Sequence, residues 1–234
     1  MIADELRTLW NLARGQPRRG THAERLQAFY APQAAHYDRF RARLLAGREE
    51  LIERLPVREG ARVVELGAGT GRNAESFGAR LVKLERLELV DLCPALLEQA
   101  RERAKRLPNV VAIEADATRY RPAAPADCAY FSYSLSMIPD WRAAIDNAVA
   151  MLRPGGTLGA VDFHLPPDAG PLERRFWTLW FARSGVRPSA EHLRYLRARL
   201  DQDYLREWRA PLPYLPGVRA PVYLFVGRRR ERAR

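Results

Sequence analysis

The chain has 234 residues, of which 47% are hydrophobic, a proportion that is ordinary for a globular protein. It holds no run of about 18 apolar residues, which excludes a bilayer-spanning helix, and its first residues do not resemble a signal peptide. The net charge of +11 favours an anionic partner, either nucleic acid or an acidic membrane surface, although almost all of it is arginine and such bias also follows genome composition. Cys93 and Cys128 are expected to be buried and unpaired, which favours a cytoplasmic location.

Residues 1–58 are expected to be helical and to form a cap over the active site. Apolar residues at helical spacing, from Ile2 to Trp10, predict a first helix, and a Gly/Pro/Arg break follows at 15–20. Further helices are expected at about 23–30 and 34–55.

From residue 59 to 228, strands alternate with helices. Strands are expected at 62–66, 86–91, 110–114, 126–132 and 157–163, with helices at 72–79, 94–107 and 141–152. This alternation predicts a doubly wound parallel sheet with helices on both faces. A helical insertion at about 168–200 is expected to hold helices 172–183 and 190–200. Strands 204–208 and 222–226 follow it, and residues 229–234 are expected to be a basic, disordered tail.

A glycine-rich turn follows the first predicted strand. The strand runs through Glu65 and Leu66 directly into Gly67-Ala68-Gly69-Thr70-Gly71. Alternating glycines let the backbone bend sharply and approach a ligand that a Cβ atom would push away. About 20 residues further on, Asp91 ends the second strand, where a Rossmann-like unit places the acceptor for ribose hydroxyls.

The Gly-x-Gly-x-Gly spacing, together with Glu65 inside the strand, resembles motif I of the class I methyltransferases that use S-adenosylmethionine. The resemblance implies an α/β, Rossmann-like fold with a seven-stranded, mostly parallel sheet and an antiparallel C-terminal hairpin at its edge. It also implies S-adenosyl-L-methionine as cofactor and S-adenosyl-L-homocysteine as product. The residues expected to bind the cofactor follow four strand ends: Glu65, Gly67, Ala68, Gly69, Thr70 and Gly71; Asp91 and Leu92; Asp116 and Ala117; and Ser132.

Four further stretches resemble the betaine-lipid N-methyltransferases: residues 29–48, residues 133–141, the aromatic residues between 176 and 181, and residues 188–196. This resemblance implies trimethylation of the homoserine amine of diacylglycerylhomoserine, which gives the betaine lipid diacylglyceryl-trimethylhomoserine. It further implies a lipid substrate at the inner face of an anionic membrane, and a companion synthase that makes the acceptor lipid.

The expected product carries a quaternary ammonium group, which aromatic rings hold by cation–π attraction. Tyr30, Tyr37 and Tyr133 are the aromatic candidates, and ordinary apolar packing is an equal alternative for them. Arg39, Arg43 or Arg48 is a candidate to pair with the acceptor carboxylate, which a guanidinium matches in a bidentate manner. The alternative for each of these arginines is a solvated role on the surface. The remaining candidates lie after the fifth strand. His164 follows that strand directly, and His192 begins the late helix of the insertion; both are candidates for a base or polar anchor. Tyr195 and Trp177, the latter in an interfacial or lid helix, complete the set.

Other functions stay open at this point. The same motif I serves methyltransferases of soluble small molecules and quinone precursors. An RNA methyltransferase is favoured by charge alone, and without an added RNA-binding module we expect no nucleic-acid partner. Residues 132–140 lack the motif of the adenine-amino enzymes, and Cys93-Pro94 reverses the cytosine-C5 nucleophile and lies in the wrong loop. We expect no metal site.

Overall fold

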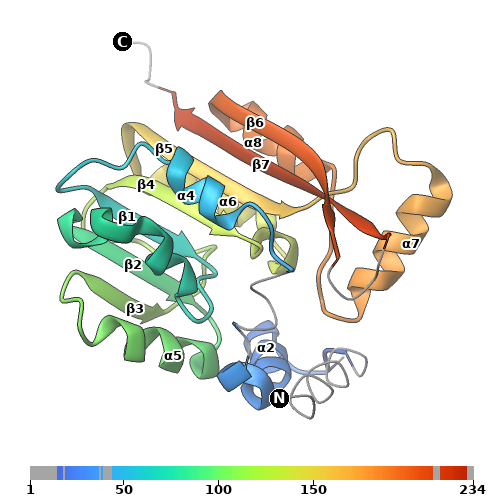
Figure 1. The fold of residues 1–234 in the computed structure, drawn as a ribbon, viewed down its shortest axis with the longest axis horizontal. Coiled ribbons are helices and arrows are strands. Elements are labelled where there is room, and N and C mark those ends of the chain that lie inside the picture. The colour runs from blue at the N-terminus through green and yellow to red at the C-terminus, as the bar shows by residue number, and fades with distance from the viewer. Residues whose placement is uncertain (1–14, 18, 37, 39–43, 213–216, 231–234) are drawn as a thin grey trace.

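A seven-stranded sheet with the strand order β3-β2-β1-β4-β5-β7-β6 forms the centre of the computed structural model (Figure 1). The structure describes residues 15–17, 19–36, 38, 44–212 and 217–230. The strands are β1 (Arg62–Leu66), β2 (Arg86–Asp91), β3 (Val110–Glu114), β4 (Ala126–Ser132), β5 (Leu152–Phe163), β6 (Leu200–Pro211) and β7 (Arg219–Arg229). Strands β1 to β5 are parallel, and β7 pairs antiparallel with both β5 and β6. The predicted sheet and its edge hairpin are therefore confirmed.

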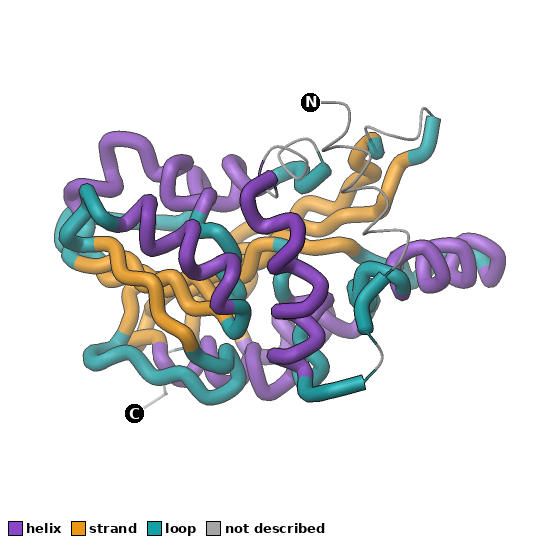
Figure 2. Tube along the Cα trace, turned by 90° about the horizontal axis from the view of Figure 1, so that it is seen from below, coloured by secondary structure: helices purple, strands orange, loops and turns teal. Residues whose placement is uncertain are grey.

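Helices cover both faces of this sheet (Figure 2). They are α2 (His22–Tyr30), η1 (Ala31–His36), α4 (Arg48–Arg54), η2 (Arg72–Lys83), α5 (Pro94–Ala104), η3 (Leu135–Met137), α6 (Trp141–Met151), α7 (Pro171–Ala182) and α8 (Glu191–Arg199). One core lies under α4, η2, α5 and α7, and the other lies under α6 and α8. Successive strand residues such as Val63 and Val64 enter opposite cores, because side chains alternate along a strand.

The predicted helix at 34–55 is wrong in its extent. The described residues of this region form the short helix η1 and then α4, which begins after Gly47. Gly47 has φ +83°, a left-handed conformation that interrupts the helix, so the chain turns at this point. The position also requires glycine because a Cβ atom there would lie 2.7 Å from the Trp208 ring. Helix α4 packs on η2, β5 and β7, so it belongs to the helical layer of the sheet although it falls within the predicted cap.

Several other predicted bounds also shift. The crossover after β1 is a 3₁₀ segment interrupted at Gly78, whose φ of 55° and ψ of −133° are not helical. Helix α5 ends at Ala104, three residues earlier than predicted. The predicted strand at 204–208 is longer, because β6 pairs with β7 from Leu200 to Pro211.

Some predicted features lie outside the described residues. These are the first helix, from Ile2 to Trp10, and the last four residues of the basic tail; Arg229, in contrast, belongs to β7. Among the described helices, none combines the length and the hydropathy needed to cross a bilayer.

Candidate functional site

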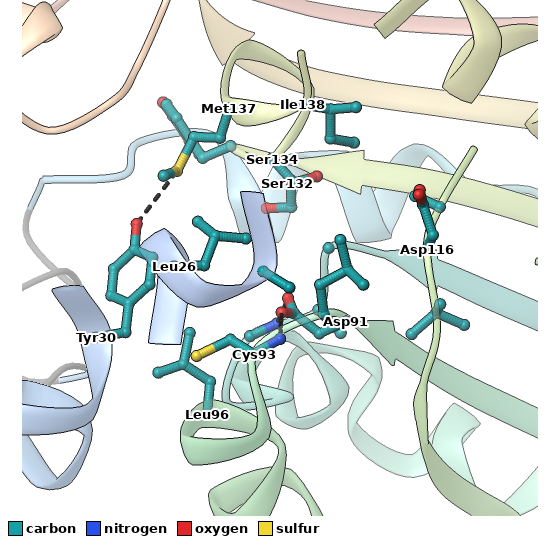
Figure 3. A pocket seen from close by; sticks show the side chains of 18 of the residues that line it. Leu26, Tyr30, Asp91, Cys93, Leu96, Asp116, Ser132, Ser134, Met137 and Ile138 are labelled. Carbon is teal, nitrogen blue, oxygen red and sulfur yellow. Dashed lines mark hydrogen bonds between the residues drawn. The ribbon is translucent and has the colours of Figure 1, made fainter. Parts of the chain in front are cut away.

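A cavity of about 500 Å³ opens at the carboxyl ends of β1, β2 and β4 (Figure 3). Its walls come from the loops after these strands, from residues 115–119 after β3, from residues 137–140, and from helix α2. The strand order reverses between β1 and β4, and ligands of doubly wound sheets bind at such a switch point. The position predicted for the cofactor site is thus where the structure has its cavity.

The loop after β1 forms the floor of this cavity. Gly67 has φ +75°, and a Cβ atom on it would lie 2.3 Å from Cβ of Ser134. Ser134 itself donates a 2.6 Å hydrogen bond to the Leu66 carbonyl, which fixes it against the loop. Gly67, Ala68, Gly69 and Thr70 line the cavity.

Gly71 is placed differently from the prediction, because it does not line the cavity. A Cβ atom there would lie 2.7 Å from the Leu89 side chain and 3.2 Å from Cβ of Ala100. Its role is therefore to let α5 pack closely on the sheet.

Two acidic side chains stand at the ends of β2 and β3. Asp91 accepts hydrogen bonds from the Gly69 N–H (2.7 Å, to Oδ2) and the Cys93 N–H (2.8 Å, to Oδ1). Asp116 Oδ1 accepts from the backbone and the hydroxyl of Thr118, both at 2.8 Å. A carboxylate oxygen has two lone pairs, so Asp91 keeps acceptor capacity for ribose hydroxyls and Asp116 keeps Oδ2. Leu92 and Ala117 line the cavity beside them.

Replacing Asp91 by asparagine is expected to weaken S-adenosylhomocysteine binding by about 10-fold to 100-fold, because charge-assisted hydrogen bonds contribute roughly 1.5–3 kcal/mol. In the asparagine variant, the side-chain N–H₂ group also faces one of the two backbone N–H donors, the Gly69 or the Cys93 N–H, and two donors cannot bond to each other. Isothermal titration calorimetry measures the effect. Glu114→Gln, an exposed acid at the end of β3, is the matched control and is expected to bind like the wild type. An unchanged affinity in Asp91→Asn would contradict the assignment.

The remaining end of the cavity lies against β4 and η3. Ser132, Tyr133 and Met137 line it, and α2 contributes Tyr30 (Figure 3 shows Tyr30 beside Met137). Ser132 Oγ is buried and has no hydrogen-bond partner in the described part of the chain, which leaves it available to a ligand. Tyr133 has φ 54° and donates a 2.7 Å hydrogen bond to the Ala46 carbonyl. Tyr30 donates to the Met137 sulfur at 3.2 Å.

Glu65 lies behind the cavity instead of lining it. Its side chain is fully buried and accepts from Asn73 Nδ2 at 2.6 Å and from the Tyr130 hydroxyl at 2.9 Å. Burial raises the pKa of Glu65 to about 7, and the two hydrogen bonds oppose that rise. Asn73 does line the cavity, so Glu65 acts on the site by holding Asn73.

Helix α2 closes the cavity from the N-terminal side. A capping box starts it, in which Thr21 Oγ1 accepts from the Glu24 N–H and the Glu24 side chain accepts from the Thr21 N–H. The apolar face of α2 packs on the start of α5 through Leu26 and Leu96. Leu26 and Tyr30 thereby reach the cavity.

A polar clamp that the sequence did not predict ties the N-terminal segment to the glycine loop. Asp38 accepts a 2.5 Å hydrogen bond from the Thr70 hydroxyl and also pairs with Arg103. Arg103 donates to the Thr70 carbonyl at 2.6 Å. The clamp joins residues 32 and 65 positions apart, and no local sequence pattern predicts such a pairing.

Four predicted site residues lie away from the cavity. His192 is fully buried, its ring centroid is 4.7 Å from that of Trp141, and burial lowers its pKa to about 4. His164 is also buried, with Nε2 2.8 Å from Glu207 Oε1. Tyr195 donates to Asp146 at 2.7 Å, and Trp177 packs in the core under α7. None of the four lines the cavity, so their predicted roles at the acceptor pocket are corrected.

For His192 and Tyr195 the physical reason is that α8 packs on α6 and on the hairpin, in the core on the other face of the sheet. Trp177 is buried under α7 in the first core, and His164 faces Glu207 of β6. Tyr37, Arg39 and Arg43 lie outside the described residues, and their predicted roles stay predictions. Within the described residues, no group of three or more His, Cys, Asp and Glu side chains is arranged to hold a metal ion.

The fold, the glycine loop and the acids after β2 and β3 together define a class I methyltransferase that uses S-adenosylmethionine. Residues 37–210 match the family model described as "Methyltransferase domain", and the chain belongs to this family. Glu65 holds Asn73 next to the glycine loop, and Asp91 and Asp116 line the same cavity.

Relatives and solved structures agree with this class. Trans-aconitate 2-methyltransferase of Methylobacterium nodulans is 33% identical over 125 residues, covering 53% of this chain and 47% of the relative. The same enzyme of Rhizobium leguminosarum bv. trifolii is 29% identical, covering 70% and 67%. The chain spans about half the length of the curated relatives that it matches first.

Two solved structures show the fold. The N-methyltransferase NodS of Bradyrhizobium japonicum WM9, in complex with S-adenosyl-L-homocysteine, has a TM-score of 0.68 at 20% identity and covers 88% of this chain and 99% of its own. The [4+2]-cyclase SpnF has a TM-score of 0.71 at 17% identity, with 92% and 98% covered. Likenesses at these identities carry no information about the acceptor.

Proposed function

We propose that the protein is an N-methyltransferase for an amino-acid head group, and that the acceptor is the homoserine amine of diacylglycerylhomoserine. The observation that carries N-methylation is the wall of the cavity formed by Tyr30, Tyr133 and Met137. The hydroxyls of both tyrosines are engaged, with the Met137 sulfur and the Ala46 carbonyl, so the rings supply aromatic surface to the cavity. Aromatic rings and a polarisable thioether suit a methylated ammonium group.

S-adenosylmethionine, when bound, supplies an activated methyl group on a sulfonium sulfur. The protein then has to orient the acceptor nitrogen in line with that methyl group and exclude water. Tyr133 is buried, and burial raises its pKa well above the ordinary value, so its hydroxyl stays neutral and keeps its bond to Ala46. Because the Tyr133 hydroxyl stays neutral and fixed, we infer that this wall positions the acceptor nitrogen and does not take its proton.

Arg48 is the cation at this end of the cavity. Its charge lowers the pKa values of both Glu65 and Tyr133, against the larger effect of burial, so it lies near the cofactor loop and the acceptor wall. Its Nε donates to the Leu45 carbonyl, and its terminal nitrogens have no hydrogen-bond partner among the described residues. A guanidinium matches a carboxylate in a bidentate manner. We assign Arg48 to the carboxylate of the methionine moiety, because both Glu65 and the glycine loop belong to the cofactor side.

The lipid identity of the acceptor rests on the resemblance of residues 29–48, 133–141 and 188–196 to the betaine-lipid enzymes. This part of the proposal requires a second enzyme that makes diacylglycerylhomoserine. It predicts diacylglyceryl-trimethylhomoserine as the product of three successive transfers.

A soluble carboxylic acid is the second candidate acceptor. It is favoured by the names of the relatives, which are trans-aconitate 2-methyltransferases, and these names support a small molecule better than a lipid. Arg119 lines the cavity and offers positive charge to such an acid. Methyl transfer would then give a methyl ester instead of an ammonium group.

Mass spectrometry separates the two candidates. Purified protein and S-adenosylmethionine are incubated with vesicles containing diacylglycerylhomoserine, with phosphatidylethanolamine vesicles, or with trans-aconitate. The expected result is the gain of one, two and three methyl groups on the homoserine lipid alone. A methyl ester of trans-aconitate, with no methylated lipid from protein that binds the cofactor, would overturn the lipid proposal in favour of the second candidate.

Replacing Tyr30 by leucine is expected to slow the last methyl transfer by about 3-fold to 30-fold, because a cation–π contact contributes roughly 0.5–2 kcal/mol. The dimethylated lipid should then accumulate. Tyr30→Phe keeps the ring and is the matched control, expected to stay within about 2-fold of the wild type. Time courses by mass spectrometry measure the ratio of dimethylated to trimethylated lipid. Equal ratios in the leucine and phenylalanine variants would remove Tyr30 from the acceptor site.

A further inference from the structure

Helix α7 exposes an apolar face that its packing does not require. Trp177 and Phe181 hold the helix on the core, and both are buried. On the other side, Leu172 is 85% exposed, Phe176 45%, Leu179 61% and Trp180 45%. These positions follow one another at helical spacing and form one stripe, the apolar stripe of α7. In the described part of the chain, Val82 is the other large hydrophobic side chain with such exposure, so the exposed apolar surface is concentrated on α7.

The charges around the stripe are positive. Arg175 and Arg183 are exposed, and among the described residues no acid lies within ion-pair distance of either. The one acid of the helix, Glu173, is paired with Arg209 at 2.6 Å and is thereby neutralised. Arg174 is used differently, because it donates to the carbonyls of Ala169, Pro166 and Pro167 and fixes the loop before the helix. An apolar stripe between unpaired arginines is complementary to an anionic lipid surface.

The helix is also connected to the acceptor wall of the cavity. Rings follow one another in contact, with centroid distances of 5.5 Å from Trp177 to Phe181, 4.3 Å from Phe181 to Phe163 and 4.8 Å from Phe163 to Tyr133. Tyr133 lines the cavity. The segment after α7 adds a second link, because the Arg187 N–H donates to the Ser136 carbonyl in η3 at 2.8 Å. Figure 1 shows α7 at one end of the molecule, past the ends of strands β6 and β7.

We propose that α7 is an interfacial helix that docks the protein on an anionic bilayer, with the apolar stripe inserted at the boundary between head groups and acyl chains. The occupant of this face is a lipid surface and not a second copy of the chain, because Arg175 and Arg183 flank the stripe and would repel their equivalents across a symmetric contact. Docking through α7 places the series of contacting rings from Trp177 to Tyr133 next to the membrane. The inference deepens the proposed function by naming the surface from which a lipid acceptor is taken.

Vesicle co-sedimentation of the full chain tests docking without cofactor or homoserine lipid. Vesicles of phosphatidylcholine with phosphatidylglycerol are compared with vesicles of phosphatidylcholine alone. We expect binding to the anionic vesicles, weakened by salt, and a loss of at least about 10-fold in affinity in the triple variant Phe176→Ser, Leu179→Ser, Trp180→Ser. The three side chains are exposed, so the variant is expected to fold. Val82→Ser, at another exposed apolar residue, is the matched control and should bind like the wild type.

The contribution of charge is tested separately. Arg175→Gln with Arg183→Gln is expected to weaken binding to anionic vesicles, while Arg106→Gln with Arg197→Gln, which removes the same charge elsewhere, should weaken it less. Unchanged vesicle binding in the triple variant would overturn the inference. So would a concentration-dependent dimer, seen by sedimentation velocity, that the triple variant abolishes.

The two proposals fail in distinguishable ways. Vesicle binding that depends on α7, without methylation of the homoserine lipid, would refute the proposed function and leave the docking helix standing. The opposite outcome is also possible to recognise. If the protein methylates the lipid in detergent micelles, but the α7 substitutions leave its vesicle binding unchanged, the docking helix alone is refuted.

Discussion

Gly67→Ala is expected to abolish measurable binding of S-adenosylmethionine, with a loss of at least about 100-fold in affinity. Gly67 has φ +75°, and its new Cβ atom would lie 2.3 Å from Cβ of Ser134. Ser134 cannot turn away freely, because its hydroxyl is bonded to the Leu66 carbonyl. Either the loop after β1 or the loop after β4 must shift, and both line the cavity. Isothermal titration calorimetry with the cofactor and with S-adenosylhomocysteine measures the loss.

Gly60→Ala is the matched control for this experiment. Gly60 has the same φ of +75°, but nothing lies within 4 Å of the Cβ atom that alanine would add. Both variants therefore carry the backbone strain of about 1–2 kcal/mol that a left-handed residue imposes, and only Gly67→Ala carries the steric clash. Gly60→Ala should lose stability and keep its cofactor affinity. Wild-type affinity in Gly67→Ala would show that the glycine is not needed for the ligand to approach.

The second large effect is expected in the pH dependence of stability, and it comes from Glu65. Burial raises the pKa of Glu65 from 4.5 to about 7. Between these two values the folded protein binds a proton that the unfolded chain does not bind, so the free energy of unfolding falls as the pH rises. The decrease due to Glu65 is of the order of 3 kcal/mol, complete above about pH 7. Glu65→Gln removes this titration, and its stability should change less between pH 5 and pH 7.5.

Urea denaturation of the wild type and of Glu65→Gln at several pH values measures this difference. Burial also raises the pKa of Asp162 to about 6 and raises the pKa of Asp91, so Glu65 is not the sole cause of the stability that the wild type loses as the pH rises. Comparing the two proteins isolates Glu65, because Asp162 is present in both. Glu59→Gln, an exposed acid before β1, should run parallel to the wild type. Parallel curves for Glu65→Gln would mean that Glu65 titrates normally in the folded protein.

The sequence predicted what local patterns determine. Apolar runs between turns located β1 to β5, and the glycine loop with Asp91 located the cavity, because strand ends in a parallel sheet meet at one edge. The helix predicted at 34–55 failed because helical spacing of apolar residues does not reveal the left-handed turn at Gly47. The clamp of Asp38 with Thr70 was not predictable, because it depends on how distant segments meet.

His192 shows a different limit. Its residue type and its place in the insertion after β5 suggested the acceptor pocket, but which face of the sheet a helix covers is decided by packing. In the structure, α8 packs with α6 through Trp141 and Leu193, and the imidazole is buried there in its neutral form. The aromatic residues of α7 were predicted to form either a lid helix packed on the sheet or an interfacial helix. In the structure, Trp177 and Phe181 pack on the sheet, whereas Phe176 and Trp180 are exposed and form the surface that the vesicle experiments test.

The described residues that line the cavity all fall between positions 21 and 140, whereas α7, α8 and the hairpin come from the chain after β5. The cofactor loops and the proposed acceptor wall of Tyr30, Tyr133 and Met137 thus come from one consecutive part of the chain, and the docking helix α7 comes from the part after it. The two parts are joined by the pairing of β4 with β5 and by side-chain contacts such as that of Phe163 with Tyr133. Identity confined to the first part is therefore a guide to the cavity and not to the surface that α7 presents.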